Sequence, residues 1–251
     1  MITQVPEPSI VDLKGIDAAF DFFELMLMAI VVAFIIYAGA QFFSRSRDKN
    51  AFEVEKKLYL GYSLFFIALG LGYGAYVLDR MWRFLFGFRL FMERPDFAFH
   101  DYMLVTFFGM SIGFIFLTYV VERHILSRKP VVAIICFIGF IYSIMLRPLE
   151  FWMMTIDEDI AEYLGYVAYI FIVLVFIMLF VIYVKICASA PVGSDLWKRS
   201  LSVLIGLTIL VLFLTLLNNQ LSLRGGFIGW LGPIISLAGL FLTKHGLSKE
   251  K

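Results

Sequence analysis

The pattern of apolar positions divides the chain into seven long hydrophobic stretches separated by short polar segments. None of the seven contains an internal Lys or Arg. A helix needs roughly 20 residues to cross the hydrocarbon layer of a bilayer, and the stretches reach or approach that length. The pattern therefore predicts seven membrane-spanning helices. They cover residues 22–43, 58–78, 102–121, 131–146, 163–184, 201–217 and 226–243.

The segments between these stretches are too short to fold by themselves. We therefore expect one polytopic membrane domain over residues 1–251, an all-α integral membrane protein located as a multi-pass protein of the cell membrane. Composition agrees, since 61% of the residues are apolar. The backbone within lipid must satisfy its own polar groups, which favours helices. The stretches at 131–146 and 201–217 are the shortest, so we expect them to borrow flanking residues or to lie where the bilayer thins. The first stretch is expected to be retained rather than cleaved.

Basic residues are distributed unevenly between the two sets of connecting segments. The segments 44–57, 122–130, 185–200 and 244–251 carry fourteen of the 21 Lys and Arg residues. The opposite set carries seven, four of them within residues 79–101. Because positive charge favours the cytoplasmic side, the sequence predicts an external N-terminus and a cytoplasmic C-terminus.

Residues 82–92 interleave bulky aromatic side chains with arginine and are too short to span a membrane. Arginine stems can reach water while aromatic rings remain at the level of the headgroups. We therefore predict an interfacial helix or a re-entrant hairpin. A plain surface linker and a lid over an outer pocket are the two roles left open.

The chain offers few residues that support catalysis or bind a metal ion. Cys136 and Cys187 are too few and too far apart in the predicted topology for a disulfide framework or a metal site. No metallopeptidase, nucleophile-elbow, phosphate-loop or redox motif is present. The seventh stretch also lacks a central lysine for a retinal Schiff base. We therefore expect no enzyme activity, metal or cofactor, and no nucleic-acid partner.

Polar residues gather at the predicted outer ends of the helices. Glu24 lies about one turn inside the first stretch, where an unpaired carboxylate is costly and needs a partner such as Arg80 or Arg147. A pair of Glu24 with Arg80 is one expected arrangement. Arg147 is expected to pair with Glu150 or Asp79. A site for a small ligand between the helices is one interpretation, and charges that simply end their helices in the headgroup layer are the other. The candidate ligand-binding residues are Glu24, Tyr73, Tyr76, Asp79, Arg80, Arg147, Glu150, Asn218 and Asn219.

Tyr73, Tyr76, Arg80 and Arg83 follow a spacing of three, four and three residues along the second stretch. That spacing places the four side chains on one face of a helix. The shared face predicts the wall of a cavity that opens toward the outside.

Glu122 and Arg123 follow the third stretch at its predicted cytoplasmic end. This acid–arginine pair resembles the acidic–Arg–aromatic motif of seven-helix G-protein-coupled receptors. The last stretch departs from that class, because it reads Gly-Pro-Ile-Ile-Ser at 232–236 where the best-known receptors have Asn-Pro-x-x-Tyr. In architecture the chain also looks like the seven-helix input modules of prokaryotic sensors. The resemblance implies that Glu122 and Arg123 form a cytoplasmic lock or partner contact.

Three pairs of glycines are spaced four residues apart, at 70/74, 109/113 and 225/229. Such spacing allows close approach of helix backbones, and we expect it to serve packing within the chain, with homodimerisation as the alternative. Pro233 is expected to kink the last helix.

These features together predict a receptor- or sensor-like module that binds a small or lipid-like ligand through its outer half. Such a module would signal by rearrangement of its helices. A small secondary transporter and an accessory subunit of a larger membrane complex are the alternatives, because the glycines and outer charges suit all three. The expected partners are membrane lipids, a small-molecule or lipid ligand, and a protein partner or a second copy of the chain.

Overall fold

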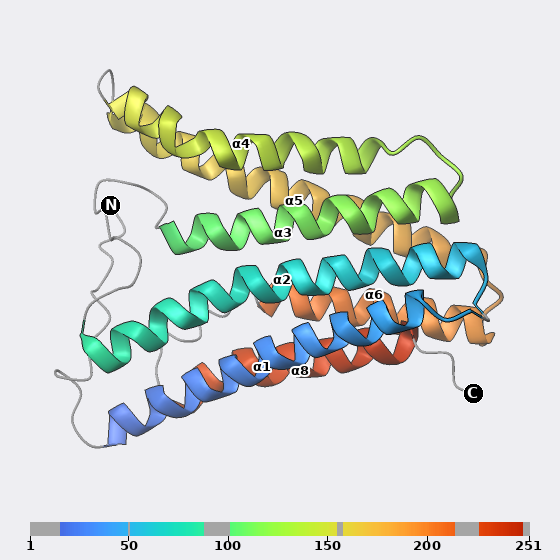
Figure 1. Ribbon diagram of the computed structural model, residues 1–251, viewed down its shortest axis with the longest axis horizontal. Helices are drawn as coiled ribbons and strands as arrows, with labels where there is room; N and C mark the ends of the chain where they lie inside the picture. Colours follow the sequence, from blue (N-terminus) through green and yellow to red (C-terminus); the bar gives the residue numbers. More distant parts are fainter. Residues whose placement is uncertain (1–15, 50, 88–100, 155–157, 214–225, 248–251) are drawn as a thin grey trace. The chain divides into compact units, whose positions relative to one another are not determined.

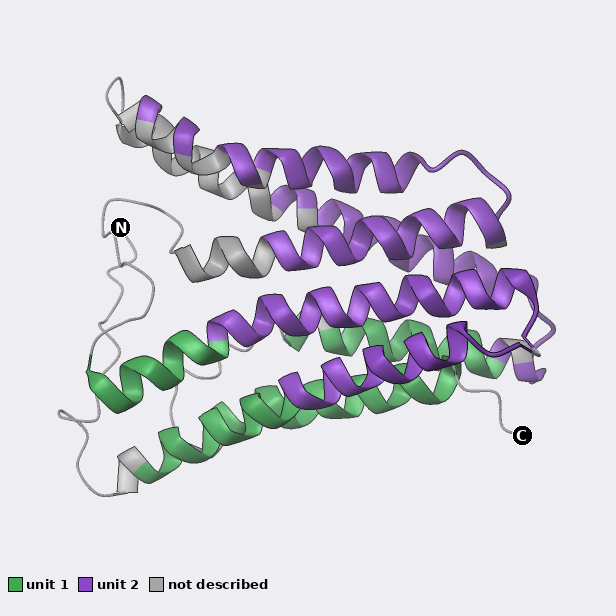
Figure 2. Cartoon of the chain, in the orientation of Figure 1, with its two compact units in different colours: residues 1–31, 77–90, 198–251 green, residues 32–76, 91–197 purple. Residues whose placement is uncertain are grey.

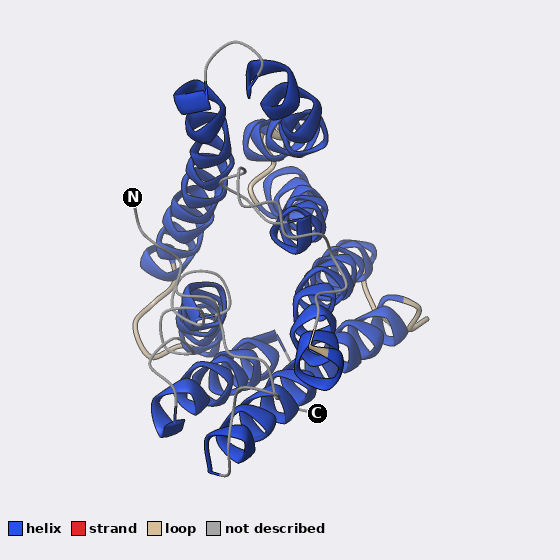
Figure 3. Ribbon diagram, turned by 90° about the vertical axis from the view of Figure 1, so that its left-hand side faces the viewer, coloured by secondary structure: helices blue, strands red, loops and turns tan. Residues whose placement is uncertain are grey.

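A computed structural model describes residues 16–49, 51–87, 101–154, 158–213 and 226–247 of the chain. Within those ranges the regular structure is helical, and Figure 3 shows no strand among them. The expected all-α class is therefore confirmed for the described residues. Long apolar segments favour this outcome, because a helix satisfies its backbone amides and carbonyls within a single segment.

Seven α-helices follow one another along the described chain, and Figure 1 labels each of them. A π-helical turn, Val121–Ile125, directly follows the third helix. The helices are α1 (Ile16–Ser46), α2 (Glu53–Phe86), α3 (Asp101–Val120), α4 (Val131–Met154), α5 (Glu158–Ser189), α6 (Asp195–Val211) and α8 (Gly226–Leu247).

The helices extend beyond most of the predicted apolar stretches. The fourth stretch was expected to borrow flanking residues, and α4 indeed continues through Pro148 to Met154. Helix α6 begins at Asp195, ahead of the stretch predicted from residue 201. The end of that sixth stretch, residues 214–217, lies outside the described residues. Backbone hydrogen bonding therefore continues the helices beyond the apolar stretches into the neighbouring polar residues.

Residues 82–92, predicted as an interfacial helix or a re-entrant hairpin, are described only as far as Gly87. Residues 82–86 are the last turns of α2, which ends at Phe86. Gly87 ends the helix with a φ of +78°, and its amide donates to the Arg83 carbonyl at 2.8 Å. This left-handed glycine cap is a common helix terminator. Residues 88–92 lie outside the described residues.

Two described helical segments are long and apolar enough to cross a membrane. They are Ala19–Ser46, with 28 residues, and Glu53–Phe86, with 34 residues. At about 1.5 Å per residue, either segment exceeds the roughly 30 Å hydrocarbon layer. Length and composition therefore allow α1 and α2 to span a bilayer.

The chain forms two compact units, which Figure 2 colours separately. Unit 1 contains residues 1–31, 77–90 and 198–251, and unit 2 contains residues 32–76 and 91–197. Helices α1 and α2 each contribute residues to both units. Every unit therefore combines segments that are far apart in the sequence.

In unit 2, α3 packs closely against α2 through glycine. A β-carbon added at Gly109 would lie 2.6 Å from the Ala68 carbonyl oxygen, and one at Gly113 would lie 3.1 Å from the Phe65 carbonyl oxygen. Gly70 lies against Ile36 of α1 in the same way. The glycine pairs 70/74 and 109/113 therefore serve packing within the chain, as predicted. Gly225 of the third pair lies outside the described residues.

In unit 1, α6 and α8 make an even closer contact, which the glycine spacing did not predict. A β-carbon at Gly206 would lie 2.5 Å from the Thr243 amide nitrogen and 2.6 Å from the Gly239 carbonyl oxygen. The Ser202 hydroxyl donates to the Leu242 carbonyl at 2.9 Å across the same contact. The backbones of the two helices therefore touch directly.

Candidate functional site

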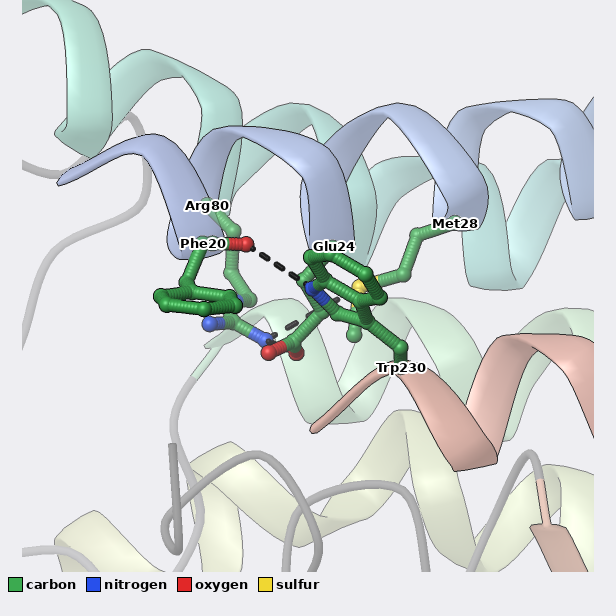
Figure 4. A network of polar contacts seen from close by, with 5 residues as sticks. All are labelled: Phe20, Glu24, Met28, Arg80 and Trp230. Atoms are coloured by element: carbon green, nitrogen blue, oxygen red, sulfur yellow. Dashed lines mark hydrogen bonds and ion pairs between the residues drawn. The ribbon is translucent and has the colours of Figure 1, made fainter. Parts of the chain in front are cut away.

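An ion pair between α1 and α2 is the central feature of unit 1. The Arg80 Nη1 atom donates to the Glu24 Oε1 atom at 2.9 Å. The Glu24 side chain is 2% exposed and the Arg80 side chain 12% exposed. Figure 4 shows the two side chains pointing toward one another. The predicted pairing of Glu24 with Arg80 is therefore confirmed.

Burial strengthens the attraction between the two charges relative to an ion pair on a solvent-exposed surface. Two unit charges about 4 Å apart attract by roughly 4 kcal/mol at an effective dielectric of 20, against about 1 kcal/mol in water. Desolvation of both groups consumes much of that attraction. The net stabilisation is consequently modest, whereas loss of Arg80 leaves the buried Glu24 charge without this counter-ion.

Trp230 of α8 lies beside the ion pair (Figure 4). The Trp230 indole N–H donates to the Phe20 carbonyl oxygen at 3.1 Å. The Trp230 ring also lies 5.4 Å from the Phe20 ring and 5.7 Å from the Phe23 ring, measured between centroids. Figure 4 draws Phe20 and Trp230 beside the carboxylate and guanidinium groups. The site therefore joins three helices that are distant in the sequence.

Met28 of α1 also contacts Arg80. Its thioether sulfur lies 3.8 Å from Arg80 Nη1 and is a weak acceptor. Phe20, Glu24 and Met28 are spaced four residues apart, so they share one face of α1. That spacing is a signal by which Phe20 and Met28 could have been found. Sequence reasoning missed both residues, and it missed Trp230, whose partner lies more than 200 residues away.

The other residues predicted for the outer site divide into three groups. Asp79 belongs to unit 1 and is buried. Tyr73 and Tyr76 are buried in unit 2, with ring centroids 5.6 Å apart. Asn218 and Asn219 lie outside the described residues, as do the side chains of Arg147 and Glu150 in α4. The pairing expected for Arg147 and the complete outer pocket therefore stay predictions.

Glu122 has a defined structural role at the junction of α3 and α4. Its two carboxylate oxygens accept hydrogen bonds from the amides of Val132 and Ala133, each at 3.0 Å. These amides belong to the first turn of α4 and have no partner within the helix. The carboxylate is buried and also carries the charge that a helix N-terminus favours.

A backbone hydrogen bond holds the turn between Glu122 and α4. The Arg128 amide donates to the Glu122 carbonyl at 2.9 Å, and Ser127 adopts a φ of +50°. Arg123, the next residue, is exposed. The structure thus joins Glu122 to α4, while the predicted partner contact through Arg123 stays a prediction.

Replacing Glu122 with alanine is expected to lower the free energy of unfolding by about 2 to 4 kcal/mol, because two buried amides lose their acceptors. Glu122→Gln retains one acceptor oxygen and should lose about half as much. Detergent-denaturant unfolding of the purified full chain, followed by circular dichroism, measures both losses. Equal stability of the alanine variant and the wild type would contradict the assigned capping role.

The described residues contain no group of three or more His, Cys, Asp or Glu side chains positioned to hold a metal ion. Comparison with known proteins adds no further assignment. No protein family, curated protein or solved structure matches this chain.

Proposed function

We propose that the chain is a seven-helix, multi-pass membrane receptor or sensor with an external N-terminus and a cytoplasmic C-terminus. Its outer half would bind a small or lipid-like ligand at the Glu24–Arg80 pair. The observation that carries the proposal is the burial of this pair between two helices. Ionisable residues within membrane helices are costly and commonly mark sites of function.

Membrane residence is supported by the outward faces of the described helices. Large apolar side chains are exposed on α4 and α5, where a water-soluble protein would normally place polar residues. Lipid tails cover such a surface without the penalty that water imposes. The most exposed of them on these two helices include Ile134, Phe137, Ile138, Trp152, Ile170 and Ile177.

A charged ligand would act on this site by competing within the ion pair. A carboxylate or phosphate could bind the Arg80 guanidinium through its planar set of N–H donors. Glu24 would then lose its counter-ion. Because the pair links α1 to α2, the ligand would favour an arrangement in which that link is broken.

Reporter fusions test the membrane topology. A green fluorescent protein fused after residue 251 is expected to fluoresce, whereas alkaline phosphatase at the same position should be inactive, since the C-terminus is predicted inside. Fusions placed after each successive apolar stretch should alternate between the two results. A chain released to the soluble fraction, or one that fails to alternate, would refute the seven-span topology.

Ligand binding is tested by thermal stabilisation of the purified full chain in nanodiscs. A panel of carboxylates, phosphates and amphiphiles is screened against the wild type and against Arg80→Lys, which keeps the charge but loses the planar fork. Arg128→Lys, at an exposed position, is the matched control. We expect a ligand that raises the melting temperature of the wild type and the control by several degrees and leaves Arg80→Lys unchanged.

Equal stabilisation of all three proteins would exclude Arg80 from the binding site. Stabilisation by protons alone, without any ligand in the panel, would instead favour the transporter alternative.

A further inference from the structure

The connection between α1 and α2 is short and belongs to unit 2. Helix α1 ends at Ser46 and α2 begins at Glu53, so six residues link them (Figure 1). The Asp48 amide donates to the Arg45 carbonyl at 3.1 Å, and the Ala51 amide donates to the Asp48 carbonyl at 3.3 Å. These two bonds link the end of α1 to Asp48 and Asp48 to Ala51, while residue 50 lies outside the described residues.

Two apolar side chains project from the beginning of α2 into the surroundings. Phe52 is 75% exposed and Val54 is 50% exposed. A phenylalanine exposed to this extent loses the benefit of burial, worth roughly 1.5 to 3 kcal/mol for a large apolar side chain. The Phe52 side chain is therefore more stable in an apolar or interfacial medium than in bulk water.

Basic residues flank Phe52 and Val54 in the sequence. Arg47, Lys49 and Lys57 are exposed. The Arg47 guanidinium carbon lies 4.3 Å from the centroid of the Phe43 ring, which orients the group without neutralising its charge. Residues 44–57 carry five basic residues against three acidic ones. Of these acids, Glu53 lies 3.5 Å from Lys56, which leaves the remaining surface predominantly positive.

In a bilayer that α1 and α2 span, the predicted apolar stretches would place this segment near the headgroups. The apolar stretch of α1 ends at Phe43 and that of α2 begins at Leu58. Phe52 therefore lies about 9 Å along the chain axis from the start of the hydrocarbon, at roughly 1.5 Å per residue. Headgroups occupy about 5 to 8 Å on each side of the hydrocarbon, so a modest tilt brings Phe52 among them.

We propose that the α1–α2 connection binds anionic phospholipid headgroups, with Arg47, Lys49 and Lys57 contacting the phosphates and Phe52 and Val54 entering the interfacial layer. Positive charge next to a membrane helix is attracted to an anionic leaflet, and an exposed aromatic ring is favoured at that depth. The proposal depends on membrane residence, which the reporter fusions test separately. It does not depend on the outer Glu24–Arg80 site.

Native mass spectrometry of the full chain released from detergent micelles tests this proposal. The protein is titrated with phosphatidylglycerol and, separately, with phosphatidylcholine. We expect a preference for phosphatidylglycerol that falls roughly 10- to 100-fold in the triple variant Arg47→Gln, Lys49→Gln, Lys57→Gln, since each basic residue near an anionic surface contributes up to about fivefold. Phe52→Ser should weaken binding of both lipids, because it removes apolar contact without changing the charge.

A second triple variant provides the control. Arg123→Gln, Arg128→Gln, Lys129→Gln removes the same charge from three exposed positions of another segment on the predicted cytoplasmic side. Retained preference in this variant supports a specific site at the α1–α2 connection. Equal losses in both triple variants, or no preference for phosphatidylglycerol in the wild type, would overturn the proposal. Unchanged circular dichroism verifies that the variants remain folded.

Discussion

Arg80→Ala is expected to lower the free energy of unfolding by about 3 to 5 kcal/mol, because it leaves the buried Glu24 carboxylate without its counter-ion. Two-state stability of small domains is commonly only 5 to 15 kcal/mol, so this loss should be visible as reduced yield and an earlier unfolding midpoint. Unfolding of the purified chain by an increasing fraction of denaturing detergent gives the measurement.

A double-mutant cycle separates the ion pair from general damage to the packing. Glu24→Gln combined with Arg80→Ala should be less destabilised than Arg80→Ala alone, because the uncompensated charge is also removed. Arg128→Ala, at an exposed position, is the matched control and should change stability by no more than about 0.5 kcal/mol. Additive effects of the two substitutions would show that Glu24 and Arg80 contribute independently.

Gly206→Ala is also expected to be strongly destabilising. The added methyl group would meet the backbone of α8, at 2.5 Å from the Thr243 nitrogen and 2.6 Å from the Gly239 oxygen. Backbone atoms cannot turn aside as a flexible side chain can, so α6 and α8 must separate. Overpacking of this kind costs roughly 1 to 3 kcal/mol or more. The same detergent unfolding experiment measures the loss.

Gly74→Ala supplies a control with the same chemical change. A β-carbon at Gly74 would meet only a methyl group of Val32, at 3.3 Å, and that methyl group can shift slightly. We expect a change of stability below about 1 kcal/mol, or a small gain from better helix propensity. A Gly206→Ala variant as stable as Gly74→Ala would show that α6 and α8 separate without cost.

The stability effect at Arg80 also determines how ligand binding must be tested. A variant that loses its folded state loses ligand binding for a trivial reason. Arg80→Lys keeps a positive charge beside Glu24 and alters mainly the geometry of the donors. The melting temperature of Arg80→Lys without ligand should equal that of the wild type. If the ligand then no longer stabilises this variant, the planar guanidinium group of Arg80 takes part in binding.

The helical segments were accessible from the sequence because a long apolar run is a local property of consecutive residues. Such runs predicted the central parts of α1, α2, α4 and α5, although not the ends of these helices. Ends depend on single contacts, such as the cap at Gly87 or the continuation of α4 through Pro148. The pairing of Glu24 with Arg80 was also predictable, since a carboxylate inside an apolar helix requires a counter-ion.

Contacts between distant helix faces were decided only by the tertiary structure. Nothing near Trp230 in the sequence indicates that its indole bonds to Phe20. Glycine spacing likewise did not reveal that Gly206 meets Gly239, because the two residues lie on different helices. The sequence also did not indicate that the Glu122 carboxylate caps α4. The sequence alone determined which segments become helices, because periodicity and hydropathy act locally. The tertiary structure decided which side chains meet, because that depends on how whole helix faces pack together.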